Sequence, residues 1–191
     1  RAVCPFAIVV YAFWRIGSKQ LATMSLPPEY LAALTPLADA FSAYEEDIGG
    51  VAVLVGGAAA AIHTDGAFMS ADFDVVAGND AAFGRAMAAA GFVIDDKALH
   101  GQCGWYHPDH PQFAVEQVSG GYFDGRAEMA RCLRLLVRDG SALVLPAIED
   151  MIADRLGQHE VSGGDTSMLE QARALFALAE GLDFAYLIRR I

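Results

Sequence analysis

Two short apolar runs, each followed by an alanine-rich stretch, constrain the fold of this chain more than any other feature. Residues 51–55 form a continuous apolar run that ends at a Gly-Gly pair, and the Ala-rich residues 58–63 follow. Residues 73–77 repeat this order, with Asn79 as the expected cap of a second Ala-rich helix that ends near residue 90. Short apolar runs bounded by turn residues are typical of buried strands, and strands that alternate with helices pack in α/β layers.

Further short strands and a helical last third complete the expected α/β (α+β) fold. One or two helices are predicted before the first strand, because apolar residues recur at helical spacing over residues 30–41. Residues 92–94, 104–107 and 112–118 are strand candidates, separated by Gly- and Pro-containing segments that suit hairpins. We therefore expect a mixed sheet flanked by helices, with amphipathic helices from Pro146 to the end of the chain.

The length of 191 residues and the apolar content of 54% predict one folded unit with a substantial core. We expect a sheet domain over residues 24–140 and a helical part over residues 141–191 that packs on it. Residues 1–23 are predicted to be an upstream extension or added sequence, because Met24 opens a stretch that resembles an ordinary protein start. The alternative is an extra strand, since residues 7–13 are rich in Val, Ile and aromatic residues.

Charge and cysteine content restrict the partners and the compartment. Thirteen Lys and Arg against twenty-four Asp and Glu give a formal charge of -11, which argues against a surface that coats nucleic acid phosphates. Three widely spaced cysteines indicate no disulfide framework, so a reducing cytoplasm is the expected location. The apolar run over residues 5–14 is about half the ~20 residues that a spanning helix needs, so no membrane partner is expected.

Acidic side chains in two expected strands form a candidate site. Asp72 and Asp74 lie on the same side of one strand, because alternate side chains share a face, and two such carboxylates can bind a hard cation together. Gly56-Gly57 lies where the preceding strand turns into a helix, and the N–H groups of such a turn favour a phosphate. If the later strand pairs beside this one, Glu116 would add a third carboxylate.

Each of these features also has a plainer interpretation. A Gly-Gly pair after an apolar strand is often only a turn, and an Asp-x-Asp strand can be an exposed sheet edge. Glu116 can belong to the solvated face of a half-buried strand.

These motifs resemble those of a known group of enzymes. The run from Val53 to Ala59 and the run from Ser70 to Val75 are similar to the glycine-turn and Asp-x-Asp motifs of the DNA polymerase beta-like nucleotidyltransferase superfamily. Within it, the chain is most similar to small bacterial proteins related to AbiEii-type toxins and to minimal nucleotidyltransferases. The resemblance covers about residues 28–190 and includes a third acid and a helical C-terminal part in matching order.

The resemblance implies transfer of a nucleotidyl group from a nucleoside triphosphate to an acceptor hydroxyl. Asp72 and Asp74 would hold two Mg²⁺ or Mn²⁺ ions, and Glu116 would complete the second ion's ligands or accept the proton. The cofactor-binding residues would be the phosphate-binding turn, a hydroxyl donor and a basic phosphate clamp: Gly56, Gly57, Ser70 and Arg155. The acceptor is an unspecified protein, small molecule or RNA, and the toxin half of a two-gene system, with a cognate antitoxin, is a further expectation.

The chain departs from the family pattern at three positions. Many relatives have a basic residue where this chain has Phe68, an Asp where it has Glu116, and a Lys where it has Arg155. The alternative function is therefore a catalytically silent protein of the same fold that binds nucleotides or other proteins.

A second candidate metal site competes with this one. His100, Cys103, His107 and His110 fall within eleven residues and are ligand types that Zn²⁺ takes, but their spacing matches no specific pattern and loop histidines are common. His63, which follows the first Ala-rich helix, either faces the phosphate pocket or is an ordinary packed or solvated histidine.

Overall fold

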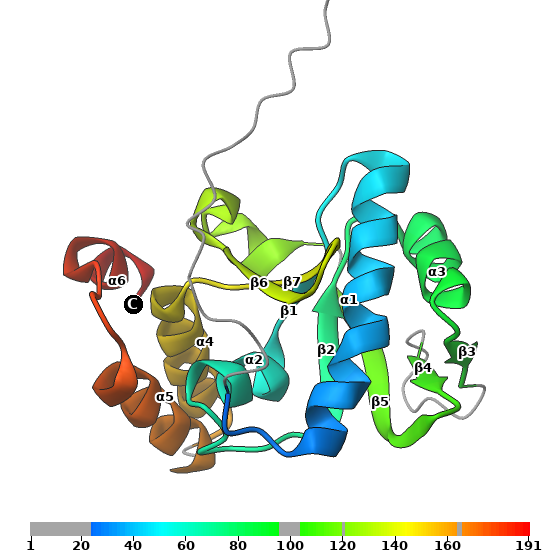
Figure 1. The fold of residues 1–191 in the computed structure, drawn as a ribbon. Helices are drawn as coiled ribbons and strands as arrows, with labels where there is room; N and C mark the ends of the chain where they lie inside the picture. Colours follow the sequence, from blue (N-terminus) through cyan, green and yellow to red (C-terminus); the bar gives the residue numbers. More distant parts are fainter. Residues whose placement is uncertain (1–23, 96–103, 120, 164–165) are drawn as a thin grey trace, which may run out of the picture.

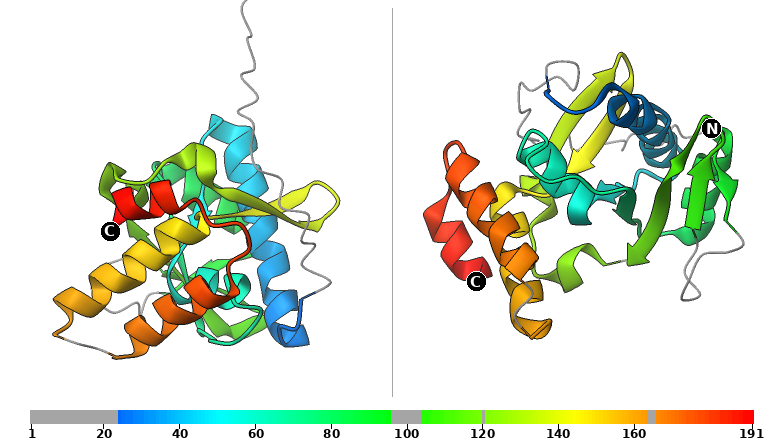
Figure 2. Two further views of the ribbon diagram at one scale, coloured as in Figure 1. Left: turned by 90° about the vertical axis from the view of Figure 1, so that its left-hand side faces the viewer. Right: turned by 90° about the horizontal axis from the view of Figure 1, so that it is seen from below.

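The computed structural model describes residues 24–95, 104–119, 121–163 and 166–191 (Figure 1). In this part of the chain, a mixed α/β arrangement of six α-helices and seven strands confirms the coarse fold expected from the sequence. The helices α4, α5 and α6 gather on one side of the molecule, away from α3 and strands β3 and β4 (Figures 1 and 2).

The main sheet has five strands in the order β1-β2-β5-β4-β3. Strands β2 and β5 are parallel, whereas the other neighbours are antiparallel, so the expectation of a mixed sheet is confirmed. The strands are β1 (Val53–Leu54), β2 (Asp72–Val76), β3 (Val93–Ile94), β4 (Gly104–His107) and β5 (His110–Ser119).

Helix α1 (Pro28–Ile48) lies across one face of this sheet (Figure 1). Tyr30 packs edge-on against Phe73 of β2 and Phe113 of β5, with ring centroids 5.3 and 5.4 Å apart. The helix continues through Pro36, so one helix forms here and not two. An internal proline costs roughly 3 kcal/mol, and the buried apolar face of α1 outweighs that cost.

Two short helices follow β1 and β2 as the sequence predicts. Helix α2 (Gly56–His63) begins directly at the glycine pair. Helix α3 (Asp80–Ala89) is capped by Asn79, whose side-chain oxygen accepts a hydrogen bond from the Ala82 N–H at 3.0 Å. The cap satisfies one of the N–H groups that the first turn of a helix leaves without an internal partner.

A two-stranded hairpin, β6 (Leu133–Arg138) and β7 (Ser141–Leu145), is an addition to the strands expected from the sequence. Its turn holds Asp139-Gly140, with Gly140 at φ 80°, and an Asp-Gly pair between apolar runs is a typical hairpin signal. The domain boundary expected after residue 140 falls in this turn. The hairpin is tied to α1 by ion pairs of Arg138 with Asp39 and Arg134 with Glu45.

The C-terminal part consists of α4 (Ile148–Val161), α5 (Thr166–Leu178) and α6 (Phe184–Arg190), as expected for this region. Asp183 caps α6 by accepting a hydrogen bond from the Tyr186 N–H at 2.9 Å. Two 3-10 turns, Tyr122–Gly125 and Met129–Arg131, connect β5 to the hairpin.

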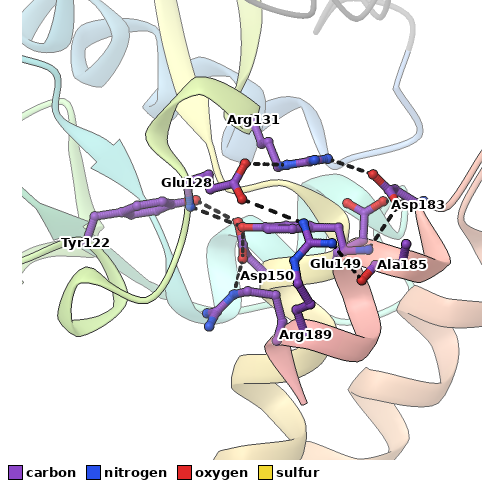
Figure 3. Close-up of polar contacts among 10 residues, drawn as sticks. Tyr122, Glu128, Arg131, Glu149, Asp150, Asp183, Ala185 and Arg189 are labelled. Carbon is purple, nitrogen blue, oxygen red and sulfur yellow. Dashed lines mark hydrogen bonds and ion pairs between the residues drawn. The ribbon is translucent and has the colours of Figure 1, made fainter.

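Asp150 of α4 is fully buried at the junction of these segments (Figure 3). Its carboxylate accepts hydrogen bonds from the hydroxyls of Tyr186 and Tyr122, at 2.8 and 3.3 Å, and from Nε of Arg190 at 2.5 Å. A buried carboxylate costs free energy unless it is paired, and here three donors surround it.

Within the described residues, no helix is both long and apolar enough to cross a bilayer. The expectations for residues 1–23 concern residues outside the described part of the chain.

Candidate functional site

The glycine turn at the start of α2 is built around the carboxylate of Asp74. Gly56 has φ 64°, and a Cβ atom at this position would lie 1.9 Å from Oδ2 of Asp74. Any side chain would therefore collide with the carboxylate as well as strain the backbone. Only glycine allows Asp74 to rest against the first turn of this helix.

Gly57 makes the same kind of contact with Ser70. A Cβ atom on Gly57 would lie 2.8 Å from Cβ and 2.9 Å from Oγ of Ser70. The Ser70 hydroxyl donates to the backbone oxygen of Asp72 at 3.1 Å and accepts from the Asp72 N–H at 3.3 Å. Ser70 thus fixes the start of β2 against the glycine turn.

The third acid lies on the neighbouring strand, directly beside the Asp pair. In the parallel register of β2 and β5, Asp74 is opposite Glu116 and Asp72 is opposite Ala114. Phe73 and Val115 point to the other face, where both are buried under α1. The strand pairing on which the three-carboxylate hypothesis depends is present.

Burial and the neighbouring acids both disfavour the ionised form of Asp74. Burial, followed by the negative charges of Glu116 and Asp72, raises the pKa of the Asp74 carboxyl to about 6, although Arg155 opposes the shift. Like charges that face one another disfavour ionisation, and a bound cation would reverse that effect. A nearby positive charge would therefore favour the ionised form of Asp74.

Asp74 and the glycine turn line a cleft of about 520 Å³ between the sheet and the C-terminal helices. Ser70 lies in the same wall, and the facing walls come from the segment after β5 and from α4 and α5. Asp72 and Glu116 lie beside the cleft without lining it. Five of the seven predicted site residues thus share one cavity: Gly56, Gly57, Ser70, Asp74 and Arg155.

Arg155 lies in the cleft wall but is already engaged. It is only 4% exposed, and its guanidinium donates two hydrogen bonds to Asp154, at 3.0 and 2.5 Å. A weaker contact of 3.5 Å joins it to Oε1 of Gln171. A role for Arg155 in binding phosphate, which stays a prediction, would require it to share its charge with Asp154 and the ligand.

Another wall of the cleft contains two residues in a backbone conformation that non-glycine residues rarely adopt. Phe123 and Asp124 both line the cleft and both have left-handed conformations, with φ 43° and 54°. Such residues cost on the order of 1–3 kcal/mol each and persist only where the surroundings impose them. The neighbouring Gly125 is the only sign of this pair in the local sequence.

No group of three or more His, Cys, Asp or Glu side chains in the described residues is already arranged to hold a metal ion. The oxygen donors of Asp72, Asp74 and Glu116 suit Mg²⁺, but they are not drawn together into such a group. In the zinc hypothesis, the His107 and His110 rings face each other with centroids 5.6 Å apart. His100 and Cys103 lie outside the described residues.

His63 lies away from the glycine turn, at the C-terminal end of α2. Its Nε2 atom is 3.0 Å from the backbone oxygen of Pro146, and its side chain lines a separate cavity of about 260 Å³. It does not line the cleft that holds Asp74.

Comparison of the chain with models of known protein families finds no match, and neither does comparison with curated proteins.

Proposed function

We propose that the protein is a metal-dependent nucleotidyltransferase that moves a nucleotidyl group from a nucleoside triphosphate to a hydroxyl acceptor, with pyrophosphate as the leaving group. One observation carries the proposal: the Asp74 carboxylate rests on the glycine turn of α2 and faces Glu116 across two paired strands, at the edge of one cleft. A phosphate site and a group of carboxylates are the two halves that such a reaction needs in one place.

The donor set fits Mg²⁺ or Mn²⁺, because hard cations prefer carboxylate oxygens and because burial and the neighbouring acids raise the pKa of the Asp74 carboxyl. Asp74 and Asp72 would hold the metal, with Glu116 as the third ligand. When bound, the metal would neutralise phosphate charge and lower the pKa of a coordinated hydroxyl.

The chain's own groups would perform the remaining tasks. The first-turn N–H groups of α2, which have no partner within a helix, would orient the phosphates at Gly56 and Gly57. As the alternative to holding the metal, Glu116 would accept the proton of the attacking hydroxyl. Ser70 would keep β2 in register with the glycine turn. The walls from α4 and α5 would exclude water from the reacting groups.

A catalytically silent nucleotide-binding protein is the second candidate. Arg155 is held by Asp154, so the most obvious cation of the cleft is not available as a simple phosphate clamp. Such a protein would bind the ligand but would not transfer a nucleotidyl group.

The test is incubation with labelled nucleoside triphosphates, Mg²⁺ and a cell extract, with the double variant Asp72→Asn/Asp74→Asn as control. Label on an acceptor with the wild type, and none with the double variant, would support transfer. Metal-dependent binding without label would favour the silent protein, and the absence of both would contradict the two candidates together.

A further inference from the structure

Residues 121–132, between β5 and the hairpin, form a wall of the cleft. Hydrogen bonds attach this segment to the C-terminal helices at two points. Near its start, the Tyr122 hydroxyl donates to Asp150 of α4 at 3.3 Å. Near its end, the Glu128 N–H donates to the hydroxyl of Tyr186 of α6 at 3.1 Å. Phe123 and Asp124, which line the cleft, lie between these two points.

The two fastening points converge on the carboxylate of Asp150. Tyr186, which accepts from the Glu128 N–H, donates its own hydroxyl proton to Oδ1 of Asp150 at 2.8 Å. Arg190 donates to the same oxygen at 2.5 Å, and this ion pair is almost completely buried. Helix α6 therefore fixes the position of the Asp150 carboxylate, and this carboxylate attaches the cleft wall to α4.

Arg131 strengthens the second fastening point. It donates to Glu128 at 2.8 Å and to Asp183 at 3.0 Å, and its guanidinium lies 4.0 Å from the centre of the Tyr186 ring. Figure 3 shows Arg131 between Glu128 and Asp183, so the end of the segment is joined to the start of α6. A cation that both pairs with carboxylates and stacks on an aromatic ring restricts all of these groups.

We propose that Tyr122 and Asp150 are positioning residues of the cleft, and that with α6 they impose the left-handed conformations of Phe123 and Asp124. Phe123 is a bulky residue that rarely adopts this conformation, and Asp, which tolerates it, does so as a single residue and not beside a second one. Within the segment, the Arg126 N–H donates to the Phe123 oxygen at 2.9 Å, which closes the turn but does not attach it to the rest of the protein. The fastening through Asp150 supplies that attachment.

The proposal concerns the shape of the cleft wall, and only its ligand-binding consequence rests on the proposed nucleotidyltransferase function. A correctly placed wall would present the Phe123 ring and the Asp124 carboxylate to whatever occupies the cleft. A released wall would leave the glycine turn and Asp74 in place but change the opposite side of the cavity.

The direct test is Tyr122→Phe, which removes the hydroxyl and keeps the ring. Tyr30→Phe is the matched control, because the buried Tyr30 hydroxyl has no hydrogen-bond partner among the described residues and Tyr30 does not line the cleft. Tyr122→Phe removes the hydrogen bonds of the hydroxyl with Asp150 and with the Cys132 side chain, and we expect amide exchange at residues 121–126 to accelerate at least roughly tenfold. Backbone chemical shifts of Phe123 and Asp124 should move away from left-handed values, whereas Tyr30→Phe should change neither measurement.

Tyr186→Phe provides a second variant, and we expect it to accelerate exchange over residues 126–131. Binding of ATP with Mg²⁺ should weaken in Tyr122→Phe at temperatures well below its melting transition. Unchanged exchange and unchanged chemical shifts in Tyr122→Phe would overturn the proposal, even if ATP binds. Faster exchange in a protein that binds no ATP in either form would uphold the positioning role and count against the proposed function.

Discussion

Asp74 and Asp150 are both at least half-buried, but the charges around the two carboxyl groups are opposite. Asp150 is fully buried and accepts hydrogen bonds from Arg190, Tyr186 and Tyr122. Asp74 is half-buried, and the nearest charges on its own sheet face are those of Glu116 and Asp72. A carboxylate surrounded by donors stabilises an architecture, whereas one beside other acids costs free energy and marks a candidate functional site.

The largest expected effect comes from removing the paired aspartate. Asp150→Ala would leave the Arg190 guanidinium almost buried with no counter-charge, and breaking one side of a buried ion pair costs roughly 3–5 kcal/mol. Urea denaturation should show this loss in the free energy of unfolding. A loss below about 1 kcal/mol, the range of an exposed pair, would mean that Asp150 does not anchor the C-terminal helices.

The glycine turn should give the next largest effect. Gly56→Ala would place a Cβ atom 1.9 Å from Oδ2 of Asp74 and force alanine into a left-handed conformation. Overpacking and strain together should destabilise the fold by roughly 2–4 kcal/mol, measured by urea denaturation.

The double variant Gly56→Ala/Asp74→Ala provides the control for this clash. Because the colliding carboxylate is absent, the double variant should recover part of the stability lost in Gly56→Ala. Simple additivity of the two single effects would show that Asp74 does not rest on the turn.

Asp74→Asn should stabilise the fold, in contrast to the substitution of Asp150. The folded pKa of Asp74, about 6, lies above its ordinary value of 3.8, so the wild type loses stability as the pH rises between these two values. A tenfold change in the acid dissociation constant corresponds to about 1.4 kcal/mol before solvent screening, and we expect a gain of about 1–2 kcal/mol at pH 8.

At pH 4 the gain from Asp74→Asn should be close to zero, because the carboxyl is then largely protonated in the fold. Thermal unfolding of wild type and variant across this range measures the difference. A gain that is equal at both pH values would contradict the assignment to Asp74.

The smallest effect is expected for an aspartate that is exposed. Asp47 pairs with Arg85 at 2.6 Å, but their side chains are 44% and 63% exposed. Asp47→Asn should change the free energy of unfolding by less than about 0.5 kcal/mol. If urea denaturation showed a loss of several kcal/mol in the free energy of unfolding, an ion pair would be stabilising even when exposed. Burial would then not be needed to explain why Asp150 stabilises the fold and Asp74 does not.

Local patterns predicted much of this molecule. The Gly-Gly turn, the alternation of Asp72 and Asp74, and the mixed sheet follow from features within a few residues of sequence. The pairing that brings Glu116 beside Asp74 needed the further assumption that β5 is the neighbour of β2. That assumption was correct, although the catalytic and metal-binding roles of these residues stay predictions.

The features that the sequence did not predict depend on contacts between distant residues. Asp150 and Arg190 are separated by forty residues, so no periodicity connects them. The left-handed conformations of two adjacent non-glycine residues, Phe123 and Asp124, persist only where the rest of the fold supports them. The hairpin is different, because Asp139-Gly140 is a local signal that the stronger helical pattern after it obscures.

Calorimetric titration of a nucleoside triphosphate measures whether the acids around Asp74 form a cation-dependent phosphate site. The titration is carried out with Mg²⁺ and with a chelator, for the wild type and for Asp74→Asn. We expect binding by the wild type with Mg²⁺, much weaker binding with chelator, and a much smaller effect of the metal in the variant. Equal affinity of the wild type with and without Mg²⁺ would contradict this expectation.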